Sequence, residues 1–246
     1  MATVRHLRKA PITEALVDFR VERRSDISAA SFADLRELLR GDYPQVDDQR
    51  GLAAKIEVRD GKLVSTTEDL GFQGLHFKSG DGLTVAQFRS DGFTLNRLAP
   101  YRNWQTLYGE AARLWPLYVE RAAPKAVLRV ALRYINELRL PLEPGEDFDL
   151  YLAAPPRIPN ELPQLLSAFL VRVVLHDREH DLACNVIQVL EPLSGPITVK
   201  LDIDVFRADE FPTDIGSLDQ VFQHLHDFKN RVFFSHLTER TVKLYE

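Results

Sequence analysis

The clearest alternation of apolar and polar side chains lies in residues 126–141. Its even-numbered positions are mostly apolar, and they are Leu128, Val130, Leu132, Tyr134, Asn136, Leu138 and Leu140. Its odd-numbered positions include Arg129, Arg133, Glu137 and Arg139. A period of two over this length predicts a long β-strand with one buried and one polar face, because a helix would spread the same residues around its circumference.

The residues before this strand predict several further elements. Residues 14–22 alternate in the same way and predict another strand. Apolar residues at helical spacing predict a short helix over residues 32–39, and residues 42–51 are expected to form a loop. Residues 53–98 predict an antiparallel meander, because β-branched and aromatic runs are separated by tight-turn sequences such as the Asp-Gly pair at 60–61.

A longer helix is predicted after the meander. Asn103 has the side chain of a good N-cap, and apolar residues from Trp104 to Tyr118 recur on one helical face. Pro116 is expected to kink this helix or to begin a new turn within it. An aromatic stripe at this spacing is typical of a core-facing surface rather than a cofactor site.

After the central strand the chain repeats a similar order. The proline-rich residues 141–163 predict a mostly stiff connection with at best one helical turn, around Phe148–Leu152. A second meander is expected, with strands starting at Phe169 and extending over residues 182–190 and 197–205. The Ser-x-x-Gln sequence at 217–220 fits a capping box that opens a long C-terminal helix.

The halves 1–124 and 125–246 thus share the order strand, helical segment, meander and helix. We interpret the chain as an α+β fold in which helices back an antiparallel sheet, built as two consecutive halves of one compact unit. This order resembles that of the duplicated TATA-binding-protein-like fold. The likeness is architectural only, and it implies nothing about DNA.

Composition narrows the class of protein. The 246 residues carry a net charge of −5, whereas a protein that relies on phosphate contacts usually has a basic surplus, so nucleic-acid binding is disfavoured. Cys184 is the only cysteine, which excludes an intramolecular disulfide and is typical of a reducing compartment. No window approaches the roughly 20 apolar residues that span a bilayer, and no signal-peptide core is present. We therefore expect a soluble, cytoplasmic protein that does not bind membranes.

Four segments carry a resemblance to a known family. They are, in chain order, Lys9–Asp18, Tyr101–Trp104, Arg133–Glu137 and Phe233–Glu239. Together they resemble a sporadically distributed bacterial and archaeal family of single-chain proteins with no established activity. The Ala-Pro-Ile-x-Glu-Ala and Arg-Tyr-x-Asn pieces are the most specific, and the resemblance covers nearly the whole chain. It implies no catalytic residues.

One motif matches a metal-dependent hydrolase. Residues His176–His180 form His-x-x-Glu-His, the inverted zinc-protease pattern. That chemistry requires both histidines on one helical face, with the glutamate as general base. The motif lies between two alternating apolar runs, so we expect it at the polar tip of a hairpin, with no metal bound. We expect no cofactor either, since no glycine-rich phosphate loop or nucleophile elbow is present.

The polar face of the two strands that begin the halves is the candidate ligand surface. Its candidate ligand-binding residues are Glu14, Asp18, Arg20, Arg129, Arg133 and Glu137. If these strands are neighbours in one sheet, acids are expected opposite arginines, where opposite charges stabilise the register. The arginines could instead hold an anionic group bidentately. The pattern favours the ion-pair ladder.

Three further polar residues lie on predicted strands. Asp202 and Asp204 share a strand face and could bind a divalent cation or act in acid–base catalysis, although alternation alone also predicts them on an exposed face. Asn136 lies among apolar neighbours, so we expect it to be buried with hydrogen-bond partners.

The sequence leaves three hypotheses for function. The first is a non-enzymatic binding or regulatory module that offers a polar sheet face, or a cavity under the C-terminal helix, to a partner protein or small-molecule ligand. The second is a hydrolase or nucleotide-processing enzyme, with or without metal, that uses the carboxylates Glu14, Asp18, Asp202 and Asp204. The third is a structural homo-oligomer, such as a homodimer, joined through the apolar helix end at 233–237.

Overall fold

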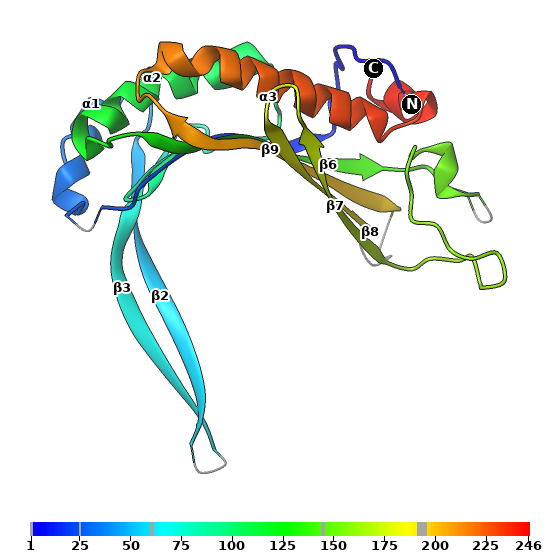
Figure 1. Cartoon of the computed structure of the whole chain (residues 1–246), viewed down its shortest axis with the longest axis horizontal. Coiled ribbons are helices and arrows are strands. Elements are labelled where there is room, and N and C mark those ends of the chain that lie inside the picture. The colour runs from blue at the N-terminus through cyan, green and yellow to red at the C-terminus, as the bar shows by residue number, and fades with distance from the viewer. Residues whose placement is uncertain (1, 25, 60–61, 144–145, 191–195) are drawn as a thin grey trace.

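The structure is a computed structural model of the whole chain. It describes residues 2–24, 26–59, 62–143, 146–190 and 196–246, with residues 52–59 and 62–68 described in their backbone only. Within these ranges nine strands form one antiparallel sheet, and two long helices lie over one of its faces (Figure 1). The α+β class predicted from the sequence is confirmed.

The sheet extends outward from two central strands. β1 (Ile12–Val21) and β6 (Val127–Arg139) pair antiparallel at its centre. The strands beyond β1 are, in order, β5 (Gly92–Leu98), β4 (Thr84–Arg89), β3 (Lys62–Lys78) and β2 (Gln45–Arg59). Those beyond β6 are β9 (Thr198–Phe211), β8 (Leu182–Leu190) and β7 (Phe169–Asp177). The first strand of each half therefore lies at the centre of the sheet, and the meander of each half forms one side of it. The duplication of the two halves stays a prediction.

The wing formed by β2 and β3 leaves the sheet as a two-stranded arm (Figure 1). The two strands pair from Gln45 opposite Lys78 to Arg59 opposite Lys62. The prediction of a loop over residues 42–51 is therefore wrong from Gln45 onward. The polar residues there form an edge strand, which pairs through its backbone and needs no apolar side chains. The turn expected at 60–61 lies outside the described residues.

Another Asp-Gly pair, at residues 91–92, does connect two strands, β4 and β5. Gly92 opens β5 at a φ of 150°, and a Cβ atom at this position would lie 2.0 Å from the carbonyl oxygen of Phe19. Only glycine fits so close to a neighbouring backbone.

Two long helices cover the sheet, α2 (Trp104–Ala122) and α3 (Ile215–Ser235). As predicted, Asn103 caps α2, since its side-chain oxygen accepts a hydrogen bond from the Thr106 amide at 2.8 Å. Pro116 lies inside α2, which continues to Ala122. No helix of the described residues is long and apolar enough to cross a membrane.

The start of α3 differs from the prediction. Asp214 is its N-cap and accepts a hydrogen bond from the Ser217 amide at 2.9 Å. The capping box predicted at Ser217 is wrong because Asp214 offers a cap one turn earlier, which places Ser217 inside the helix. The remaining helical pieces are short: η1 (Ala29–Phe32), α1 (Leu35–Leu38), η2 (Phe148–Leu150), α4 (Glu239–Val242) and η3 (Lys243–Tyr245).

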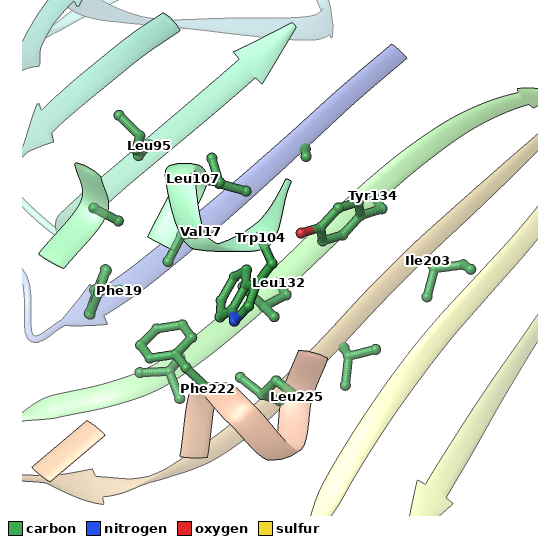
Figure 2. Packing of buried hydrophobic residues seen from close by; sticks show 14 of the residues in the cluster. Val17, Phe19, Leu95, Trp104, Leu107, Leu132, Tyr134, Ile203, Phe222 and Leu225 are labelled. Atoms are coloured by element: carbon green, nitrogen blue, oxygen red, sulfur yellow. The ribbon is translucent and has the colours of Figure 1, made fainter. Parts of the chain in front are cut away.

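The core fills the space between the sheet and the two helices. Figure 2 shows side chains of the central strands, among them Val17 and Leu132, facing Trp104 of α2 and Phe222 of α3. Aromatic rings dominate one part of this layer, where Phe19 stacks on Trp115 with centroids 4.3 Å apart. Burial of such rings is the main favourable term in the fold.

The alternation that predicted the central strand is confirmed along most of β6. Leu132, Tyr134 and Asn136 are buried on the helix-covered face, whereas Arg129 and Arg133 lie on the other face, where they pair with aspartates of β9. Leu128 is the exception and is 44% exposed. The register with β9 shifts between Val127 and Arg129, and such a bulge changes the face on which a side chain lies.

Candidate functional site

The open face of the sheet carries the candidate residues chosen from the sequence. Asp18 lies at its centre and is only 4% exposed. Its carboxylate accepts hydrogen bonds from four side chains: Thr94 at 2.5 Å, Arg20 at 3.0 Å, Arg89 at 3.1 Å and Arg129 at 3.4 Å. A buried carboxylate held by so many donors is part of the folded structure.

The arginines of β6 are paired in the same way. Arg129 also bonds Asp204 at 3.0 Å, and Arg133 bonds Asp202 at 2.6 Å. As expected, β1 and β6 are neighbours, but the register differs from the expectation. Arg20 lies opposite Arg129, so the carboxylates reach the arginines diagonally and from β9 rather than from directly opposite positions.

The two remaining candidates on this face also have partners. The Glu14 carboxylate accepts a hydrogen bond from the side-chain amide of Asn96. Glu137 accepts a hydrogen bond from Arg139 at 3.0 Å and lies opposite Lys200 in the sheet. We call this set of paired residues the polar-face network. Its cations and carboxylates balance one another, which is typical of a structural ladder rather than an open anion site.

The His-x-x-Glu-His motif lies where the sequence predicts it, at the tip of the hairpin between β7 and β8. Potential ligand atoms of Asp177, Glu179 and His180 lie within 4.8 Å of one another. His224 of α3 lies beside His180, with ring centroids 4.1 Å apart. The sequence alone does not indicate this contact, because the two histidines are far apart along the chain. Arg231 already bonds the Asp177 carboxylate, so part of the cluster's negative charge is neutralised.

A cavity of about 410 Å³ lies under α3, and we call it the α3 cavity. It is bounded by α3, the start of α2, the central strands and the N-terminal residues. Its apolar wall includes Leu7, Ile12, Tyr101, Trp104, Phe233 and Phe234. A mostly apolar cavity of this volume is in the range of small-molecule sites.

Lys229 of α3 is the most unusual residue of this wall. Its side chain is buried, with 7% of the residue exposed, and its Nζ lies 4.0 Å from the ring centroid of Tyr134. The Nζ donates a hydrogen bond to Asn230 Oδ1 at 2.6 Å, and no carboxylate of the described residues pairs with it. Burial lowers the pKa of Lys229 to about 7. Charged groups are rarely buried without a partner of opposite charge. Lys229 is therefore a candidate functional residue, and a bound ligand could offset the cost of burying its amine.

His226, one turn before Lys229, faces the same cavity. Its ring stacks on Trp104 with centroids 4.8 Å apart, and its Nε2 lies 3.4 Å from the side-chain nitrogen of Asn230. Its Nδ1 is buried, makes no hydrogen bond within the described residues, and lies 3.6 Å from an oxygen of the Asp227 carboxylate. Burial, and then the charge of Lys229, lowers the pKa of His226 to about 4. At neutral pH the ring is therefore uncharged.

His226 predicts a pH dependence of stability. Its pKa is about 4 when folded and near 6.5 when unfolded, so the unfolded chain binds more protons between these values. Stability is therefore lost as pH falls from 6.5 to 4, by up to about 3 kcal/mol for this shift. His226→Gln should flatten that part of the curve, measured by urea unfolding at pH 7 and pH 4.5. Equal pH slopes in both proteins would contradict the assignment.

Two tyrosines and an asparagine complete the polar wall. The hydroxyls of Tyr101 and Tyr134 lie 3.1 Å apart, and burial raises the pKa of both groups, that of Tyr101 to about 12. Both hydroxyls therefore stay protonated at neutral pH. Asn136 is buried as predicted and donates a hydrogen bond to the Leu201 carbonyl at 2.9 Å.

Residues 2–9, here called the N-terminal strap, pass along the outside of the α3 cavity. The Ala2 amide donates to the Leu237 carbonyl at 3.0 Å, and Arg5 pairs with Glu239 and Glu246 at 2.7 Å each. Figure 1 shows both chain ends near the end of α3. Phe233 is 7% exposed and Leu237 is fully buried, so the apolar helix end expected at a dimer contact is covered within the chain.

A larger cavity of about 640 Å³ lies on the other side of the start of α2. Its charged groups other than Arg102 are paired with one another, among them Arg97 with Asp81 at 3.1 Å and Arg113 with Glu110 at 2.7 Å. Arg102 lines both cavities and has no partner among the described residues. The larger cavity is the weaker candidate for a ligand site, because its paired charges already have partners and do not need a ligand to neutralise them.

Sequence reasoning missed Lys229 and His226 as site residues. A signal for Lys229 exists, because it lies four residues after Leu225 and seven after Phe222 on the apolar stripe of the helix. At such a position, either the helical face is assigned wrongly or the lysine side chain is buried with the apolar stripe. The sequence does not show which side chains surround Lys229 in space, because Tyr101 lies in the loop before α2 and Tyr134 lies in β6.

No family model matches the chain, and no curated protein matches it either.

Proposed function

We propose that this protein is a non-enzymatic binding module that takes a small organic molecule into the α3 cavity. The observation that carries the proposal is Lys229, a buried amine on an aromatic wall whose one hydrogen-bond acceptor within the described part of the chain is Asn230. A ligand with an apolar or aromatic body and an oxygen acceptor would fill the cavity and give the amine a second acceptor.

The placement of the sequence segments supports the same site. Each of the four segments that resemble the sporadically distributed family contributes to the cavity wall. The contributing residues are Ala10, Ile12, Tyr101, Arg102, Asn103, Trp104, Tyr134, Asn136, Phe233 and Phe234. We propose that the chain belongs to that family and that the α3 cavity is what the four segments have in common.

A thermal-shift titration tests the proposal. Benzoate, an aromatic body with an oxygen acceptor, is expected to raise the melting temperature of the full chain in a concentration-dependent way. A ligand that binds only the folded state stabilises it by about 2.7 kcal/mol at one hundred times its Kd. Benzyl alcohol and cyclohexanecarboxylate separate the contributions of the charge and of the ring.

Two variants show whether the cavity is responsible. Lys229→Met should abolish the benzoate shift, whereas Lys125→Met, which removes an exposed lysine far from the α3 cavity wall, should retain it. A shift of equal size in both variants would place binding elsewhere. The absence of a shift with all three compounds would count against this class of ligand.

A further inference from the structure

The amine of Lys229 has the surroundings of a nucleophile. Lys229 lines the α3 cavity rather than lying wholly within close-packed core, so a molecule held in the cavity lies beside its side chain. Its contacts are the face of Tyr134 and one amide oxygen, and neither holds the proton as a carboxylate would. A lysine desolvated in an apolar pocket is a standard form of activated amine.

We infer that Lys229 Nζ condenses with the aldehyde or ketone group of a small carbonyl compound in the α3 cavity and forms an imine. The inference rests on the proposed function, because the carbonyl compound must first bind in this cavity. It adds a covalent step and a ligand class to that proposal.

The reaction balances without an oxidant or a reductant. The lone pair of Nζ attacks the carbonyl carbon to form a C–N bond, and a proton moves from nitrogen to oxygen to give a carbinolamine. The hydroxyl then takes up a proton and leaves as water while the C–O bond breaks, and the nitrogen releases its remaining proton to solvent to give the imine, so no proton is consumed overall. The hydroxyls of Tyr101 and Tyr134 line the same cavity and remain protonated, so they can donate hydrogen bonds to the carbonyl oxygen.

The state of the amine favours this step at neutral pH. A pKa of about 7 leaves a large share of Lys229 uncharged, whereas an ordinary lysine, with a pKa of about 10.4, is almost fully protonated. The other charged or titratable groups on the cavity wall are Arg5, His6, Tyr101, Arg102, Tyr134 and His226. His226 is uncharged, and Arg5 is paired with two carboxylates.

Reductive trapping tests the inference. The full chain is incubated with limiting benzaldehyde and sodium cyanoborohydride, and then examined by intact mass spectrometry and peptide mapping. We expect one benzyl group per chain, located on Lys229, with a labelling rate that reaches half its maximum near pH 7. Lys229→Arg, which keeps a cation but has no reactive amine, should lose this label.

Two outcomes would overturn the inference. One is labelling spread over the lysines to the same extent in the wild type and in Lys229→Arg. The other is a label on Lys229 whose rate rises only toward pH 10. His226→Gln is the control for the pH profile, because it removes the neighbouring titrating group and should leave the midpoint near 7.

The result also separates this inference from the proposed function. If benzoate stabilises the wild type but benzaldehyde leaves no adduct, the cavity binds ligands and the covalent step is wrong. If neither compound acts, both proposals fail. The pH trends differ too: noncovalent benzoate should bind more tightly as pH falls below 7 and Lys229 becomes charged, whereas imine formation should slow.

Discussion

Lys229→Met is expected to stabilise the protein at pH 7 and below, by several kcal/mol and at most about 5 kcal/mol. The pKa of Lys229 is about 7 when folded and near 10.5 when unfolded, so between these values the unfolded chain binds more protons. Stability of the wild type therefore rises with pH through this window and is lowest below it. Methionine removes the titration while keeping much of the apolar stem.

The gain in Lys229→Met should shrink steadily as pH rises from 7 toward 10.5. Denaturant unfolding at pH 6, 8 and 10 measures it, with Lys125→Met as the control that should stay close to the wild type. A destabilised Lys229→Met at pH 6 would mean that the contacts with Tyr134 and Asn230 outweigh burial of the charge. In that case the lysine would be structural, and its role as the ligand-binding amine would lose its main support.

Asp18→Asn is expected to destabilise the protein by about 3–5 kcal/mol, the range found when one member of a buried ion pair is removed. Asp18 is 4% exposed, and Arg89, one of its partners, has a side chain only 15% exposed. An amide keeps the shape of the carboxylate but leaves these cations without a balancing charge. Urea unfolding at pH 7 measures the change.

The matched control for this variant is Asp209→Asn. Asp209 pairs with Arg207 at 2.9 Å, but its side chain is 48% exposed, so its loss should change stability by less than about 1 kcal/mol. If Asp18→Asn were as mild as this control, the polar-face network would not be structural. The hypothesis of an anion-binding sheet face, with Arg129 and Arg133 as its cations, would then regain support.

These expectations assign the two faces of the sheet different roles. The open face holds paired charges and serves stability, whereas the covered face holds a cavity with an unpaired amine. The first hypothesis from the sequence named both surfaces, and the pairing of Arg129 with Asp18 and Asp204 now favours the cavity. The same pairing counts against these aspartates as catalytic carboxylates, because their oxygens already accept hydrogen bonds from arginine side chains within the sheet.

Local pattern was sufficient for most of the fold. Alternation predicted β1, β6 and most of β9, because a side chain's face in a strand depends only on its position in the local sequence. Two of the predictions were wrong because local pattern did not determine these features. Asp214 capped α3 before Ser217 could, and β2 paired through its backbone despite a polar start.

The sequence by itself determined that Lys229 would lie on the apolar stripe of a helix and that Asn136 would be buried, because burial follows from periodicity. Only the tertiary structure decided that these residues meet Tyr101, Tyr134 and Trp104 around one cavity. Such a meeting joins residues that are far apart in the sequence, since 33 positions separate Tyr101 from Tyr134 and 95 separate Tyr134 from Lys229, and no local pattern encodes these contacts. The physical reason is that the free energy of an unpaired amine depends on its three-dimensional surroundings, through desolvation and through the partners that the fold supplies.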